Sequence, residues 1–178
     1  MKLNYKSKNQ GLTLIEALIW FAIFAAVVAG VFSLYSSSRN ASNASTVNKE
    51  LSTIFSQTEQ LYASDDTATL SNTIGLQLGI FPKSAKVNGI IVNNVFGGTI
   101  TLTGQAPSGF TVVYTNIPSG EVCSNIVRAQ KAVGWDTGNG VAYDSSYTIA
   151  NVGKSCGSNG AAAKSLTFVR ATTAPAGP

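Results

Sequence analysis

The longest hydrophobic stretch of the chain lies near its N-terminus. Residues 12–35 are apolar except at Thr13, Glu16, Gly30 and Ser33. As a helix that rises about 1.5 Å per residue, this stretch would extend roughly 36 Å, whereas the hydrocarbon core of a bilayer is about 30 Å thick. The pattern therefore predicts a helix that can span a membrane.

Apolar positions continue at helical spacing beyond a short polar segment. Residues 36–45 are small and polar, a composition that is also typical of a linker. Beyond them an apolar stripe recurs every three or four residues, which is the period of one helix face, and Ala41 and Ala44 extend it backwards into the polar segment. We therefore expect one long helix whose second half, residues 36–64, packs on a globular head. The stripe comprises Ala41, Ala44, Val47, Leu51, Ile54, Phe55, Thr58, Leu61 and Tyr62.

Residues 65–178 are expected to form this head. Alternating apolar and polar residues after Pro82 favour β-strands, and Gly97-Gly98 is typical of a two-residue hairpin turn. The predicted fold class is therefore α+β, with a long N-terminal helix packed on an antiparallel β-sheet. The expected strands are residues 90–96, 99–103, 110–115 and 166–170.

The C-terminal half combines a second helix with a long polar segment. Proline is favoured in the first turn of a helix, so we expect Pro118 to open one with a single apolar face. Residues 135–160 are rich in Gly, Asn, Ser and Asp and are expected to form a surface loop. Cys123 and Cys156 follow a membrane-targeting segment, and we expect them to form one disulfide that closes this loop. The apolar face comprises Val122, Cys123, Ile126, Val127 and Val133.

Positive charge is concentrated ahead of the apolar stretch. Lys2, Lys6 and Lys8 supply three of the four net positive charges, so the rest of the chain is nearly neutral. Basic residues before an apolar helix favour a cytoplasmic N-terminus, with the remainder outside. Because the body carries so little net charge, nucleic acid is not expected as a partner.

The chain contains no histidine. Histidine is the commonest general base near neutral pH and the commonest transition-metal ligand in proteins. We therefore expect no enzyme activity, no catalytic residues, no metal site and no cofactor.

Glu16 is the one charged residue within residues 12–35. A carboxylate at the centre of a bilayer costs on the order of 2.5–3.5 kcal/mol, so it needs a partner. A plain membrane anchor gives this acid no role, and a secretory signal would have a shorter apolar region followed by an Ala-x-Ala-like site. In the simplest alternative, Glu16 reaches the lipid headgroups from near the start of the helix.

The segment Gly11-Leu12-Thr13-Leu14-Ile15-Glu16 follows a short basic leader and opens the apolar helix. It resembles the prepilin peptidase signature of type IV pilins. The resemblance implies that residues 1–11 are a cytoplasmic leader and that the peptidase cleaves between Gly11 and Leu12. It also implies that Glu16 pairs with the new Leu12 amine of a neighbouring subunit in a fibre.

The head is similar to that of type IVb pilins, because a helix carries the first of two widely separated cysteines and a strand follows the second. Glu16 and its neighbours, residues 78–82 and residues 118–123 further resemble the PilS-type major subunit of the thin pili of conjugative plasmids. The resemblance implies an inner-membrane precursor that polymerises into an extracellular fibre for mating or adhesion. The implied partners are further copies of the chain, prepilin peptidase, the inner-membrane assembly platform, the outer-membrane secretin and a minor pilin at the tip.

Two other functions remain open at this point. A minor pilin or a type II secretion pseudopilin would share the N-terminal chemistry. A DNA-binding pilin would instead collect nucleic acid electrostatically. The basic residues considered for that role are Arg128, Lys131, Lys154, Lys164 and Arg170.

Overall fold

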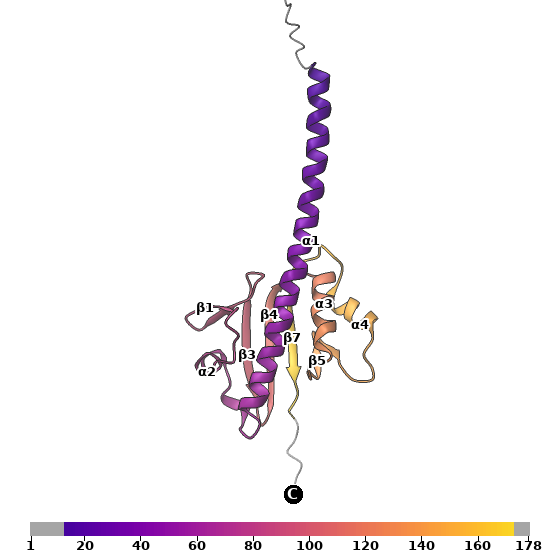
Figure 1. The fold of residues 1–178 in the computed structure, drawn as a ribbon. Coiled ribbons are helices and arrows are strands. Elements are labelled where there is room, and N and C mark those ends of the chain that lie inside the picture. The colour runs from indigo at the N-terminus through magenta and orange to yellow at the C-terminus, as the bar shows by residue number, and fades with distance from the viewer. Residues whose placement is uncertain (1–12, 173–178) are drawn as a thin grey trace, which may run out of the picture. The chain divides into compact units, whose positions relative to one another are not determined.

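The computed structural model describes residues 13–172, which divide into two compact units, with the boundary between Arg39 and Asn40. One helix, α1 (Leu14–Leu61), contributes residues to both units (Figure 1). The prediction of a single long helix is therefore confirmed. Residues 36–45 are helical rather than a linker.

Hydroxyl side chains in the second half of α1 bond to the helix backbone one turn earlier. Ser52 Oγ donates to the carbonyl oxygen of Asn48 at 2.9 Å, and Thr53 Oγ1 donates to that of Lys49 at 2.8 Å. These bonds satisfy the hydroxyl groups within the helix, although bonds of this kind slightly weaken a helix. The serine- and threonine-rich composition is therefore compatible with helix.

Within residues 40–178 the strands form one seven-stranded sheet in the order β1-β2-β3-β4-β7-β5-β6. Every pair of neighbouring strands is antiparallel, as the sequence predicted. The last strand, β7, lies in the interior of the sheet between β4 and β5. The strands are β1 (Lys86–Asn88), β2 (Ile91–Asn93), β3 (Thr99–Gln105), β4 (Gly109–Ile117), β5 (Thr137–Gly138), β6 (Val141–Ala142) and β7 (Lys164–Arg170).

The helices that follow α1 are short. Asp66 caps the N-terminus of the first of them, because its Oδ1 accepts a hydrogen bond from the Ala68 N–H at 2.7 Å. Thr148 caps the last in the same way, since its Oγ1 accepts from the Asn151 N–H at 3.2 Å. The elements are the 3-10 helix η1 (Thr67–Thr69), α2 (Asn72–Gln77), α3 (Glu121–Gln130) and α4 (Ile149–Cys156).

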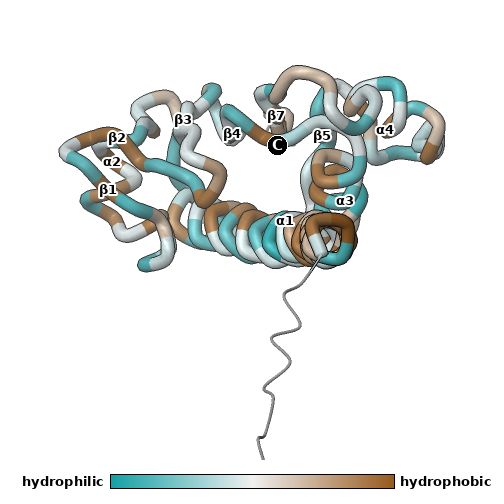
Figure 2. Tube along the Cα trace, turned by 90° about the horizontal axis from the view of Figure 1, so that it is seen from above, coloured by the Kyte–Doolittle hydropathy of each residue, from teal (hydrophilic) through white to brown (hydrophobic). Residues whose placement is uncertain are grey.

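The hydrophobic core of this unit lies between the sheet and the helices α1 and α3, which cover the same face (Figures 1 and 2). Phe55 of α1 packs against Phe110 of β4 and against Trp135, with ring centroids 5.7 and 4.8 Å apart. Trp135 also contacts Phe168 of β7. Such aromatic pairs contribute about 0.5–1.5 kcal/mol beyond the area that they bury. They join α1 to the centre of the sheet.

The apolar stripe of α1 is buried in its middle but not at its ends. Ala44, Val47, Leu51 and Ile54 are core residues, and Thr58 is buried with them. The predicted stripe was wrong at its limits, where Ala41 and Leu61 are exposed. Helical spacing places residues on a face, but burial also requires that the opposing elements reach that far.

The predicted hairpin is formed by β2 and β3, but its connection is longer than a two-residue turn. Asn93 pairs with Thr99, so residues 94–98 form the loop. Asn94 organises this loop, because its Oδ1 accepts hydrogen bonds from the N–H groups of Phe96 and Gly98 at 2.8 and 3.1 Å. The side chain of Asn94 thus satisfies backbone N–H groups of the loop that have no partner in a strand, and so it stabilises the longer connection.

Helix α3 begins later than predicted. Gly120 has φ +74°, outside the helical region, and Glu121 is the first helical residue. A Cβ at position 120 would also collide with Asn159, whose Oδ1 accepts a hydrogen bond from the Glu121 N–H at 2.6 Å. Pro118 therefore precedes the helix, and Val133 follows its end, although Val133 still packs against the core.

The prediction that residues 135–160 form a surface loop was wrong. This segment contains β5, β6 and α4, and Trp135 is 3% exposed. The Trp135 indole N–H donates to Oε1 of Gln130, a buried polar residue, at 3.1 Å. The polar composition of residues 135–160 gives no local signal for the two strands, which have two residues each. The pairing of β5 with β7 holds them in the sheet.

Candidate assembly site

The first half of α1 presents large apolar side chains on all sides. Leu14 is 81% exposed, Phe21 72% and Trp20 64%. By length and composition, α1 can cross a membrane. A helix that is apolar all round is stable only where lipid or other protein surrounds it. This surface therefore requires a covering that residues 13–172 do not themselves supply.

Glu16 is an exposed acid in the first turn of α1. The N–H groups of a first helical turn lack partners within the helix, and the resulting partial positive charge favours a carboxylate there. Within residues 13–172 both ion pairs involve Arg170, so no basic side chain of the described chain pairs with Glu16. The carboxylate is therefore exposed and has no ion-pair partner among these residues.

Gly11 and Leu12, the predicted processing residues, lie outside the described residues. The cleavage position and the Leu12 amine therefore remain predictions. Glu16 is the described member of the predicted assembly pair.

Cys123 and Cys156 form a disulfide, which confirms the predicted pairing. Their Cα atoms are 5.5 Å apart, and both residues are completely buried. Cys123 lies in α3, and Cys156 is the last residue of α4. The bond therefore joins two helices through cysteines that are 33 residues apart in the chain, whereas the sequence predicted that it closes a loop.

Sequence reasoning missed a buried acid, Glu50, on the face of α1 that packs in the core. Only 1% of its surface is exposed, and its Oε1 accepts a hydrogen bond from Ser84 Oγ at 3.1 Å. Its Oε2 and the Tyr114 hydroxyl are buried without a hydrogen bond of standard geometry. The signal that could have found it was spacing, since Glu50 lies three residues after Val47 and four before Ile54.

Burial governs the titration of this cluster. Loss of water around the carboxylate raises the pKa of Glu50, and the interactions with Ser84 and Tyr114 only partly oppose that effect. Burial and the nearby Glu50 charge together raise the pKa of Tyr114 far above its usual range. At neutral pH Tyr114 is a neutral phenol, while Glu50 is held in an environment that disfavours its charge.

Three of the five basic residues considered for DNA binding are engaged within the head. Arg170 donates from Nε to Glu59 Oε1 and from Nη1 to Asp136 Oδ2, both at 3.1 Å. Lys164 Nζ donates to the Ser155 carbonyl oxygen at 2.8 Å. Lys131 Nζ lies 4.2 Å from the centroid of the Tyr147 ring. Arg128 and Lys154 are exposed.

A family model described as PilS N terminal matches residues 41–171, more than half of the chain. The match covers nearly all of the unit that contains the sheet and excludes the exposed apolar part of α1. No curated protein and no solved structure gives a significant match to the chain.

Proposed function

The chain belongs to the PilS N-terminal family of type IV pilin-related proteins and is therefore a pilin-type subunit; from this premise we propose that it is the major subunit of a type IVb pilus serving mating or adhesion. The observation that carries the proposal is Glu16, an acid without a partner among the described residues, at the start of an exposed apolar helix. A structural subunit needs such a surface, since polymerisation covers it.

The proposed assembly step begins with cleavage between Gly11 and Leu12 by prepilin peptidase. Cleavage frees the α-amino group of Leu12, which is protonated near neutral pH. In a fibre core, that ammonium group and the Glu16 carboxylate of the adjacent subunit would both be poorly solvated, and pairing offsets the cost of removing them from water. The pair sets the axial register, while the apolar side chains around it supply most of the burial energy.

The proposed location follows from charge and disulfide chemistry. The three leader lysines favour an N-terminus in the cytoplasm and a head outside the inner membrane. A disulfide such as Cys123–Cys156 persists in an oxidising compartment, which an exported head reaches. The proposed partners are further copies of the chain, prepilin peptidase, the assembly platform, the secretin and a minor pilin at the tip.

Substitution Glu16→Ala tests the pairing directly. We expect Leu12 to remain the first residue of the processed chain, because the carboxylate is not needed at the cleaved bond, and we expect extracellular fibres to be lost. The measurements are N-terminal sequencing with intact mass, and electron microscopy of sheared fibres. Glu121→Ala is the matched control, because Glu121 is also an exposed acid in the first turn of a helix, and it should leave fibres intact.

Normal piliation of the Glu16→Ala variant would contradict the pairing. A first residue other than Leu12 would contradict the processing site. The amount of the chain in sheared fibres separates a major subunit, which should dominate the preparation, from a minor pilin or a pseudopilin.

A further inference from the structure

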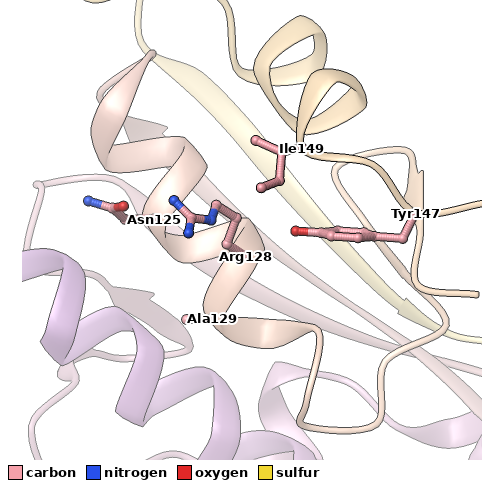
Figure 3. Close-up of a pocket in the computed structure, with 5 residues that line it drawn as sticks. All are labelled: Asn125, Arg128, Ala129, Tyr147 and Ile149. Carbon is pink, nitrogen blue, oxygen red and sulfur yellow. The ribbon is translucent and has the colours of Figure 1, made fainter.

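A surface depression of about 460 Å³ lies between α3 and the segment that leads into α4 (Figure 3). In Figure 3, Arg128 lies between Asn125 and Tyr147, and the Tyr147 hydroxyl points across the depression toward α3. Ile149, 64% exposed, projects from the start of α4. The lining residues are Asn125, Arg128, Ala129, Tyr147 and Ile149.

The two walls of this depression are fixed to each other. The Cys123–Cys156 disulfide joins α3 to α4. The Tyr143 hydroxyl also donates to the carbonyl oxygen of Val127 in α3, which attaches the segment before α4 to the same helix. A site with fixed walls loses little conformational freedom when a ligand binds, so even a small ligand retains more of its contact energy.

The charge in the depression is positive and uncompensated. No carboxylate within residues 13–172 forms an ion pair with Arg128. Asp144 lies three residues before Tyr147 in the sequence, but its Oδ1 accepts hydrogen bonds from the N–H and the hydroxyl group of Ser146. Lys131, one helical turn after Arg128, stacks over the Tyr147 ring and adds a second positive charge at the rim.

These groups match a ligand that combines one carboxylate with an apolar ring face and hydroxyl groups. A guanidinium binds a carboxylate through two parallel hydrogen bonds. The Tyr147 hydroxyl and the Asn125 amide can donate to or accept from hydroxyl groups, while Ile149 offers an apolar contact. We propose that this depression binds a carboxylate-bearing sugar residue, such as a uronic acid of an acidic surface polysaccharide.

Nucleic acid fits these observations less well. Residues 40–172 carry eight basic and seven acidic side chains, so the head has almost no net charge to attract a phosphate backbone. Arg170 and Lys164 are occupied within the head. One free guanidinium beside an apolar surface is suited to a single anionic group.

The test uses the full chain in detergent micelles, so it does not depend on polymerisation and its failure would leave the proposed function untouched. Methyl β-D-glucuronide and methyl β-D-glucoside are titrated separately and followed by saturation-transfer NMR. We expect the glucuronide to bind at least about tenfold more tightly, because only it can form the charge-assisted pair.

Arg128→Gln should remove this preference, and Lys154→Gln is the matched control. Lys154 is an exposed basic residue of α4 that does not line the depression, so its loss changes the net charge equally and should leave the preference unchanged. Because Arg128 is exposed, both variants should keep the melting temperature of the parent.

Several results would overturn the proposal. Equal binding of the two sugars, or an unchanged preference in Arg128→Gln, would show that the Arg128 guanidinium does not select for the carboxylate. Displacement of the glucuronide by an equal concentration of inorganic phosphate would indicate a site for small anions in general. Displacement by a short oligonucleotide that weakens steeply with added salt would assign the depression to nucleic acid.

Discussion

Glu50 is the residue whose placement is least expected from its chemistry. It lies in the core of the head, next to Tyr114 and in contact with Ser84, although a buried carboxylate is costly. No basic side chain of the described residues pairs with it. Its cost is reduced when it carries a proton, which is why burial raises its pKa.

The stability of the head should therefore depend on pH through Glu50. The folded chain holds this proton more tightly than the unfolded chain, in which the pKa is near its ordinary value of about 4.5. The contribution of Glu50 is then most favourable below that value and is lost as the pH rises toward the raised pKa of the folded state. Glu50→Gln should remove this dependence and should be more stable than the parent at neutral pH.

The measurement is the free energy of unfolding by urea at several pH values for the parent, for Glu50→Gln and for Glu59→Gln. Glu59 is the matched control, because it lies on the same helix but is half-exposed. A parent whose stability did not fall relative to that of Glu50→Gln with rising pH would contradict the argument.

Among the elements, the pair of helices joined by the disulfide holds the C-terminal part of the head in place. Removing the bond with Cys123→Ala and Cys156→Ala should lower the free energy of unfolding by about 4 kcal/mol in the chain-entropy description, since the bond closes a long stretch of chain. Reducing the parent with dithiothreitol in denaturant titrations should give a similar loss. Equal stability of the reduced and oxidised chains would contradict this expectation.

The elements that could be predicted from the sequence are those defined by local patterns. The 3.6-residue period of α1 and the alternation in β3 extend over enough residues to be recognised alone. In contrast, β5 and β6 have two residues each and depend on the pairing of β5 with β7, in which Gly138 pairs with Phe168 and Thr137 with Val169, 30 and 32 residues later in the chain. No local pattern could have indicated them.

The candidate sites differ in the same way. Glu16 could be singled out because a charge within an apolar run is visible in sequence alone. The depression beside Arg128 could not, because Tyr147 and Ile149 are far from α3 in sequence and are brought to it by long-range contacts, among them the disulfide and the hydrogen bond from Tyr143 to Val127. The loop after β2 was mispredicted because the side chain of Asn94, rather than the glycines, determines its length.

At the scale of the whole molecule, the orientation of the precursor in the membrane should depend on its leader. Replacing Lys2, Lys6 and Lys8 with glutamine leaves Arg39 and Lys49 as the nearest basic side chains, on the other side of the apolar stretch. The positive charge would then favour the opposite orientation. We expect a several-fold fall in the fraction of chains whose head is degraded by protease added to spheroplasts.

The matched control replaces Lys83, Lys86 and Lys154, three exposed lysines of the head, with glutamine. It changes the net charge by the same amount and should leave the accessible fraction unchanged. Equal accessibility of the two triple variants would show that the leader charges do not set orientation.

The interior position of β7 bears on when the head can form during synthesis. Strands β1–β4 precede β7 in the chain, and β5 joins them only through β7, so the sheet stays in two pieces until residues 164–170 are available. A nascent chain therefore cannot complete this sheet before residues 164–170 have been translated. A stop codon before residue 164 would leave both β4 and β5 with an unpaired edge, and the product should be degraded by proteases.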